Sequence, residues 1–293
     1  MSTRLAATAL LVGLGLSGLA VACAHNAPSG FADPDGGVGV APPKGTFADS
    51  GSSIVQEDGP ECAAETQQIY VIGTDKGFYR FYPADLKFVR VGTLGCPTSA
   101  GTFSMAIDRH GVAWVEYTDG RLYAVNTLDG TCQATAFTSG QAGFTNFGMG
   151  FALNEDDAKA GERLFVAGTA LGTIDTKSFD LKFIGSLTFG RTELSSIGSH
   201  LYAFSVGTGV VAELDKTNGS TVKTYRTSAI DDKAGFAFAQ WGGSFWLFTG
   251  ETTSTVTSYT PATDTSKVVI PDTNGIVIVG AGSSTCAPIT PPK

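Results

Sequence analysis

Five polar residues next to strand-like segments of the sequence have side chains that could act on a shared ligand. They are Asn146, Arg191, Glu193, Asp232 and Asn274. All but Arg191 carry amide or carboxylate oxygens, which are the ligands that a hard cation such as calcium prefers. Arg191, with Tyr117, would instead serve a surface that holds a protein or a glycan without chemistry. The residue types therefore leave a calcium site and a binding surface as two alternatives.

The motifs of common hydrolases and metal sites are missing from the sequence. There is no G-x-S-x-G nucleophile motif. The three histidines, His25, His110 and His200, lie far apart, and neither H-E-x-x-H nor C-x-x-C occurs. Two glycine-rich stretches, GVGVAPPKGT and IVGAG, are not followed by a helix whose N-terminal amides could bind phosphate. We therefore expect no catalytic residue, no metal and no cofactor, with calcium as the alternative.

The net charge of the chain limits which classes of partner the protein can bind. The 293 residues include 19 Lys and Arg against 27 Asp and Glu, a formal net charge of −8. The phosphate backbone of a nucleic acid would be repelled by such a surface, and no cluster of Lys and Arg offsets the repulsion. We exclude nucleic acids and anionic lipid head groups as partners.

The amino terminus has the layout of a secretory signal. It carries one cation at Arg4, an apolar core from Leu5 to Leu19, and small residues before Cys23. The stretch Ala20–Ala22 before Cys23 resembles the lipobox of bacterial lipoproteins, although Ala20 stands where that motif usually has Leu, Val or Ile. The resemblance implies cleavage before Cys23 and lipidation of this cysteine. An ordinary signal peptide would be cut at the same bond and leave a free thiol.

The same resemblance implies a location and a domain organisation. Ala24 is not the Asp that retains lipoproteins at the inner membrane, so the protein is expected on the outer membrane of a Gram-negative cell, held by its lipid anchor alone. Residues 1–22 would be the signal peptide. Residues 23–65, rich in Gly, Pro, Ser and Asp, would form a flexible tether. The folded domain is expected at 66–288, followed by a tail at 289–293.

A repeat of apolar, aromatic, apolar triplets runs through the folded domain. The triplets are Ile69-Tyr70-Val71, Ala113-Trp114-Val115, Leu164-Phe165-Val166, Leu201-Tyr202-Ala203 and Phe245-Trp246-Leu247. Their aromatic residues are 44, 51, 37 and 44 positions apart. This spacing is the size of a four-stranded propeller blade. Two further strand-like segments, separated by Gly-, Asn-, Asp- or Pro-containing turns, follow each triplet. After the second triplet, the outer of these two segments is Gln133–Phe137.

A fourth kind of strand precedes the triplets and alternates small with large residues. Its members are Phe103–Ile107, Phe147–Ala152, Leu194–Ile197, Phe236–Gln240 and Ile276–Val279. A blade tapers toward the axis of a propeller, where neighbouring strands crowd, so this composition predicts the innermost strand. The first triplet has no such strand before it, and Ile276–Val279 has no triplet after it. We therefore expect Ile276–Val279 to lie beside Ile69–Gly73 and to close the ring.

The cysteines agree with this closure. Excluding Cys23, an even set of four remains, which is expected to pair in an oxidising compartment. Of the three possible pairings, the one that matches the order of the ring joins Cys62 to Cys286 and Cys96 to Cys132.

The sequence thus predicts an all-β fold, a five-bladed β-propeller, with a six-bladed propeller and a two-sheet sandwich as alternatives. The loops between blades should bring Asn146, Arg191, Glu193, Asp232 and Asn274 to one face near the axis. The predicted function is that of a cell-envelope lipoprotein whose propeller binds or scaffolds a protein or glycan. The alternative is a hydrolase that resembles the calcium-dependent lactonases built on propellers.

Overall fold

A computed structural model describes residues 61–157, 159, 161–205, 208–227 and 235–292 of the chain. The predicted signal peptide, Cys23 and most of the predicted tether lie outside these residues. Within the described part of the chain, no helix is long and apolar enough to span a membrane.

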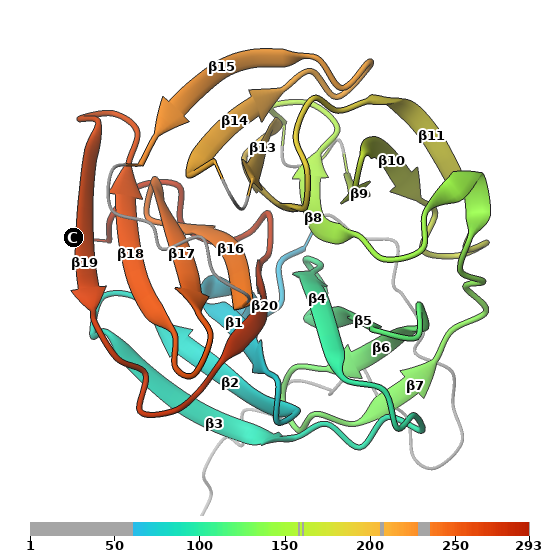
Figure 1. Cartoon of the computed structure of the whole chain (residues 1–293), viewed down its shortest axis with the longest axis horizontal. Helices are drawn as coiled ribbons and strands as arrows, with labels where there is room; N and C mark the ends of the chain where they lie inside the picture. Colours follow the sequence, from blue (N-terminus) through green and yellow to red (C-terminus); the bar gives the residue numbers. More distant parts are fainter. Residues whose placement is uncertain (1–60, 158, 160, 206–207, 228–234, 293) are drawn as a thin grey trace, which may run out of the picture. The chain divides into compact units, whose positions relative to one another are not determined.

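The described residues form five four-stranded antiparallel sheets arranged as the blades of a ring (Figure 1). The first blade comprises β20 (Ile278–Ser283), β1 (Ile69–Gly73), β2 (Gly77–Tyr82) and β3 (Lys87–Thr93). The second comprises β4 (Thr102–Ile107), β5 (Val112–Tyr117), β6 (Leu122–Asn126) and β7 (Cys132–Ala134). The third comprises β8 (Gly148–Leu153), β9 (Glu162–Ala167), β10 (Ala170–Ile174) and β11 (Leu181–Ser186). The fourth comprises β12 (Thr192–Ile197), β13 (His200–Ser205), β14 (Val210–Leu214) and β15 (Thr221–Arg226). The fifth comprises β16 (Gly235–Trp241), β17 (Ser244–Gly250), β18 (Thr255–Thr260) and β19 (Thr265–Ile270). The prediction of a five-bladed propeller is confirmed.

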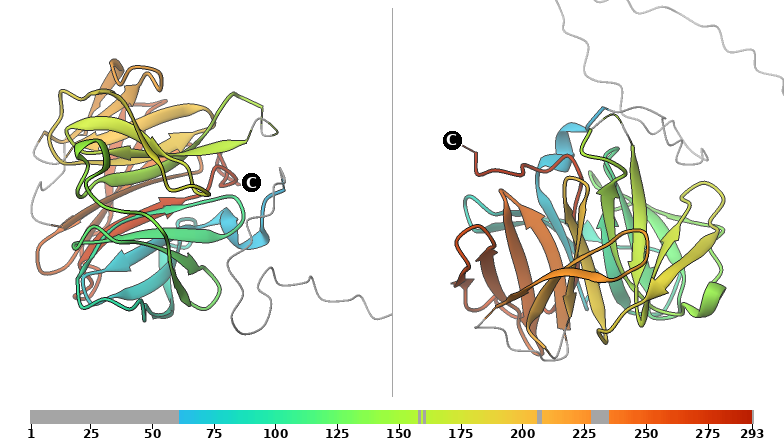
Figure 2. Two further views of the ribbon diagram at one scale, coloured as in Figure 1. Left: turned by 90° about the vertical axis from the view of Figure 1, so that its right-hand side faces the viewer. Right: turned by 90° about the horizontal axis from the view of Figure 1, so that it is seen from above.

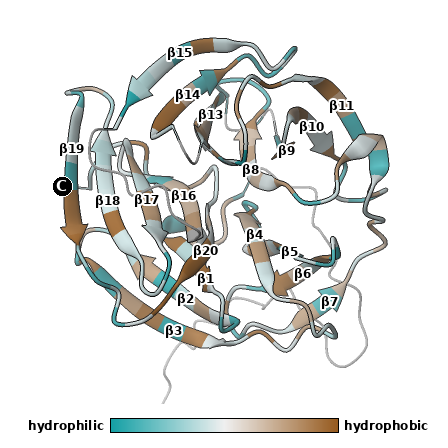
Figure 3. Ribbon diagram, in the orientation of Figure 1, coloured by the Kyte–Doolittle hydropathy of each residue, from teal (hydrophilic) through white to brown (hydrophobic). Residues whose placement is uncertain are grey.

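Burial explains the triplet repeat. The five triplets lie in β1, β5, β9, β13 and β17, the second strand of each blade, and their residues are buried between neighbouring blades. A strand that is covered on both faces carries a continuous apolar run, which the triplets supply. Apolar residues occur along the strands of all five blades (Figure 3). The outermost strand β15, by contrast, has exposed residues at most positions.

The C-terminal strand closes the ring as predicted, because β20 pairs with β1 in antiparallel register. Val71 lies opposite Ala281, and Ile72 lies opposite Gly280. The bounds differ from the prediction, since the strand begins at Ile278 and continues to Ser283. Gly280 and Gly282 disfavour a strand locally, yet a Cβ at either position would lie about 3 Å from atoms of β1 or β4. Crowding near the axis therefore requires these glycines inside the strand.

Both predicted cysteine pairs are bonded in the structure. Cys62 and Cys286 have Cα atoms 5.9 Å apart, and Cys96 and Cys132 have Cα atoms 5.1 Å apart. The first bond joins the segment before β1 to the segment after β20, next to the short 3-10 helix η1 (Ala64–Gln67). Both segments lie on one face of the ring, which we call the terminal face (Figure 2).

One outer strand is shorter than predicted. The sequence suggested a strand over Gln133–Phe137, whereas β7 ends at Ala134. Phe137 leaves the edge of the sheet and packs on Phe147 of the third blade, with ring centres 5.7 Å apart and the planes nearly perpendicular. The chain then forms a second short 3-10 helix, η2 (Gln141–Gly143), before it enters β8. The apolar pattern of this segment therefore reflects contact between blades rather than an extended strand.

Candidate functional site

A cavity of about 670 Å³ opens where loops between blades meet the start of the inner strands. Its wall combines the loop before β8, the β9–β10 turn and the loop before β12, and residues of β4, β11 and β16 complete it. The residues of this wall that matter below are Phe103, Phe144, Asn146, Gly148, Thr169, Phe183, Gly190, Arg191, Glu193 and Phe236. We call the side of the ring that carries these loops the cavity face.

Three of the five candidate residues line this cavity. They are Asn146, Arg191 and Glu193. Asn274 does not line it and is exposed in the β19–β20 loop, where its backbone N–H donates to the Asp272 carboxylate at 2.6 Å. Asp232 lies outside the described residues. Tyr117 is fully buried, so it cannot present a binding group at the surface.

Arg191 is the exposed cation of the cavity wall. Its guanidinium carbon lies 5.1 Å from the centre of the Phe236 ring, which is a cation–π contact. Among the residues that the structure describes, it forms no hydrogen bond or ion pair. Its N–H donors therefore stay available to a molecule in the cavity.

Glu193 sits two residues further along, at the buried edge of the same wall. Its side chain accepts a hydrogen bond of 2.9 Å from the Ser104 hydroxyl, which in turn accepts one of 3.2 Å from the Met149 N–H. Burial raises the pKa of the Glu193 carboxyl well above its usual range, although hydrogen bonds from Ser104 and the Met149 N–H and the charge of Arg191 oppose this shift. The raised pKa favours the protonated, neutral form of this carboxyl.

Glu116 of β5 is a second buried acid at this place, and the sequence analysis missed it. It accepts a hydrogen bond from the Phe147 N–H at 3.0 Å and a longer one from the Asn146 side chain at 3.4 Å. Burial raises the pKa of its carboxyl well above the usual range, and the nearby Glu193 raises it further. An acidic residue inside the apolar run VAWVEY was the signal that could have identified it.

The contacts of Asn146 join these groups into one assembly. Its side-chain amide donates to Glu116 and also to the Tyr117 carbonyl, at 3.2 Å. This amide therefore holds the loop before β8 against β5 and sets one wall of the cavity. The residues that the sequence analysis assigned to ligand binding thus serve partly to build the site.

No metal centre is assembled from the described residues. Among them, no group of three or more His, Cys, Asp or Glu side chains is placed to hold an ion. Of the oxygen donors considered for calcium, Glu193 is bonded to Ser104 and Asn274 lies away from the cavity. These two residues do not converge with Asn146 on one point.

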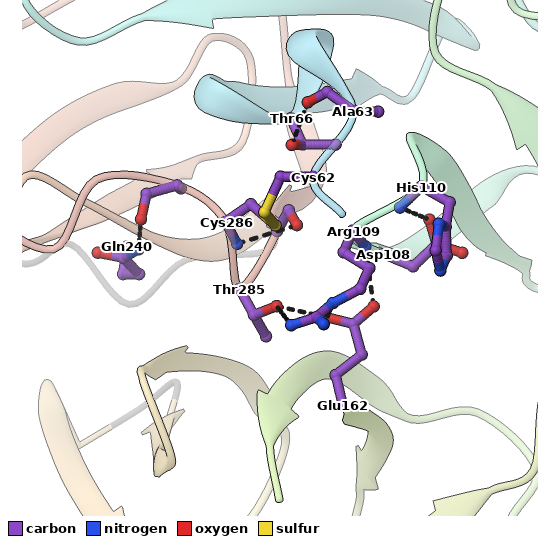
Figure 4. The surroundings of a disulfide bond; sticks show 12 residues. Cys62, Ala63, Thr66, Asp108, Arg109, His110, Glu162, Gln240, Thr285 and Cys286 are labelled. Atoms are coloured by element: carbon purple, nitrogen blue, oxygen red, sulfur yellow. Dashed lines mark hydrogen bonds and ion pairs between the residues drawn. A yellow bond between two sulfur atoms is a disulfide. The ribbon is translucent and has the colours of Figure 1, made fainter. Parts of the chain in front are cut away.

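A separate buried cluster lies at the terminal face beside the Cys62–Cys286 bond (Figure 4). The Glu162 carboxylate accepts hydrogen bonds from the backbone N–H of Arg109 at 2.8 Å and from the Thr285 hydroxyl at 2.5 Å. Its carboxylate also lies 3.8 Å from the Arg109 guanidinium. The cluster connects the β4–β5 turn, β9 and the segment after β20. Its hydrogen bonds therefore stabilise the packing of segments that lie far apart in the sequence.

Comparison with known proteins gives similarity of fold alone. No family model matches the chain, and no curated protein matches it. A chain in the crystal structure of a nidogen/laminin complex is 12% identical over 74% of this chain and 85% of that chain, with a TM-score of 0.44. The extracellular domain of the one-component system BT4673 from B. thetaiotaomicron is 14% identical over 74% of this chain, with a TM-score of 0.39. This chain spans 30% of the second protein. At such values the likenesses carry no inference about function.

Proposed function

We propose that this protein is a cell-envelope binding module, which holds a protein or a glycan in the cavity between the third and fourth blades. The observation that carries the proposal is the cavity itself, which combines aromatic rings and polar loop atoms with an exposed Arg191 that has no ion pair among the described residues. Concave sites with an apolar lining and a few polar groups are typical of ligand recognition.

The cysteines support a location outside the cytoplasm. Two disulfides among the described residues indicate folding in an oxidising compartment. With the signal-like amino terminus and the lipobox-like residues before Cys23, this favours a lipid-anchored protein of the outer membrane, tethered by residues 23–65. We expect a Cys23→Ala variant to lose incorporation of radiolabelled palmitate and to leave the membrane fraction, with the propeller still folded. Unchanged labelling of the variant would contradict the lipid anchor.

The binding function is tested by filling the cavity. Thr169, an exposed residue of the β9–β10 turn, lines the cavity, and a Thr169→Trp variant should occupy much of its space. Thr224→Trp, on exposed β15 outside the cavity, serves as the matched control. The wild type and both variants are applied to peptide and glycan arrays. We expect ligands that bind the wild type and Thr224→Trp but not Thr169→Trp. Absence of any ligand, or ligands that Thr169→Trp leaves unaffected, would contradict the proposal.

A further inference from the structure

We infer that the ligand of this cavity bears a carboxylate beside an aromatic or apolar group, and that Arg191 is the residue that binds the carboxylate. The inference rests on the proposed function and specifies the chemistry of its ligand. A free C-terminus after an aromatic residue and a small aromatic acid share this chemistry.

Arg191 has the geometry and, among the described residues, the free donors to bind a carboxylate. A guanidinium presents a rigid fork of N–H donors that matches the two oxygens of a carboxylate. In the described part of the chain, no carboxylate is bonded to the Arg191 fork, and its position is set by the Phe236 ring 5.1 Å away. Stacking on a ring holds the plane of a guanidinium while leaving its edge free to donate hydrogen bonds.

The charge of the cavity wall also favours an anionic group. The charged residues of this wall, as far as the structure describes it, are Arg191 and Glu193. Glu193 is 2% exposed and is hydrogen-bonded to Ser104. Burial raises the pKa of both Glu193 and the neighbouring Glu116, which favours their neutral forms and reduces the negative charge that these two described residues set against Arg191. The overall charge of −8 opposes an anionic ligand at long range. Salt screens that repulsion beyond about 8 to 10 Å, whereas a direct contact inside a concave site is screened much less.

Aromatic side chains surround Arg191 in the cavity wall. Phe103, Phe144, Phe183 and Phe236 line the same space, and the Phe183 side chain is 55% exposed. Aromatic rings of this kind bind other rings by offset or edge-to-face packing. A cavity of about 670 Å³ falls within the range that encloses a small molecule or a few residues of a peptide.

The test compares N-acetylphenylalanine with its neutral amide, which has the same ring and the same shape. Dissociation constants are measured by NMR titration of the propeller. We expect the wild type to bind the acid about tenfold more tightly than the amide. An Arg191→Gln variant should bind both probes equally. Arg226→Gln, which removes a guanidinium from exposed β15, should keep the preference for the acid.

Equal affinity of the wild type for the two probes would overturn the inference, and so would a preference that survives Arg191→Gln. Failure of both probes to bind at millimolar concentration would overturn it as well. The proposed function fails separately, when no array ligand depends on the open cavity. An array ligand that is blocked by Thr169→Trp and carries no carboxylate would leave the binding function standing while rejecting this ligand class.

Discussion

At the scale of single residues, Gly148 sets how closely two inner strands approach beside the cavity. A Cβ at this position would lie 2.0 Å from the Thr192 carbonyl oxygen and 2.6 Å from the Glu193 Cα. Both obstacles are backbone atoms, so no side chain can turn away to make room. We expect Gly148→Ala to lower the free energy of unfolding by on the order of 2 kcal/mol, because the third and fourth blades must separate.

Gly190 provides the matched control for this prediction. It lines the same cavity, and a Cβ there would meet nothing within 4 Å. We expect Gly190→Ala to change the free energy of unfolding by less than about 0.5 kcal/mol. Urea unfolding of both variants measures the difference. Equal stabilities would show that β8 and β12 are not packed as closely as described.

The titration of Glu162 makes a second prediction at this scale. Burial and the nearby Asp108 outweigh the attraction of Arg109 and raise the pKa of Glu162 from 4.5 to about 7. A carboxyl whose pKa is higher in the folded state binds more protons there than in the unfolded chain. Protonated Glu162 therefore contributes its full stabilisation at a pH below the pKa of the unfolded chain. This contribution is lost as the pH rises from about 4.5 to about 7. The loss corresponds to about 3 kcal/mol.

We expect a Glu162→Gln variant to show a shallower fall in the free energy of unfolding over this pH range. Glu251→Gln, at an exposed position in the β17–β18 turn, removes the same charge and should keep the slope of the wild type. Urea titrations at several pH values between 4.5 and 7.5 provide the measurement. A slope that Glu162→Gln leaves unchanged would show that Glu162 is ionised across this range in the folded protein.

At the scale of elements, main-chain hydrogen bonds and the Cys62–Cys286 disulfide together stabilise the pairing of β20 with β1. The disulfide closes a sequence separation of 224 residues, against 36 for Cys96–Cys132. In the chain-entropy account, these separations correspond to about 5 and about 4 kcal/mol. Replacing Cys62 and Cys286 by Ala should therefore cost more stability than replacing Cys96 and Cys132.

Hydrogen exchange distinguishes a local from a uniform effect of the first pair. Without the Cys62–Cys286 bond, the amides of β20 should exchange faster than those of β8. The reason is that β20 comes from the C-terminal end of the folded chain and would then be held against β1 by non-covalent contacts alone. Removal of Cys96 and Cys132 should leave β20 protected and affect the second blade instead. Equal acceleration in β20 and β8 would contradict a role of the disulfide in holding the closing strand.

At the scale of the whole molecule, the ring should tolerate a different starting point. The Cα atoms of Cys62 and Cys286 lie 5.9 Å apart, a distance that one intervening residue spans. A permuted chain can therefore run from Asp272 to Thr285, through three glycines, and from Ala63 to Pro271. We expect it to fold cooperatively without the Cys62–Cys286 disulfide, because β20 then becomes a continuous neighbour of β1.

A second permutant with the same linker, opened between Trp246 and Leu247 inside buried β17, is the control. It should fail to fold, because the new charged termini would lie in the interior. Circular dichroism and calorimetry of the two permutants provide the comparison. Failure of the Asp272 permutant would show that the closing blade depends, beyond its strand contacts, on the covalent bond or on the segment after Cys286, where Ala287 is buried and the Pro288 carbonyl accepts from the Gly242 N–H.

The sequence by itself was sufficient for the ring. Strands buried on both faces need apolar triplets, and inner strands need small residues, so each blade leaves a local pattern such as Leu201-Tyr202-Ala203. The order of the blades then identified both the closing strand and the cysteine pairs. These features were predictable because each depends on the composition of one strand or on the order of strands along the chain.

The tertiary structure alone decided the site. Asn146, Arg191 and Glu193 share a cavity while Asn274 does not, although all four flank inner strands in the sequence. The burial of Glu116 and the extension of β20 through Gly280 depend equally on what other blades place beside them. Burial and convergence are properties of contacts between residues far apart in the chain, and a local pattern of residue types does not contain them.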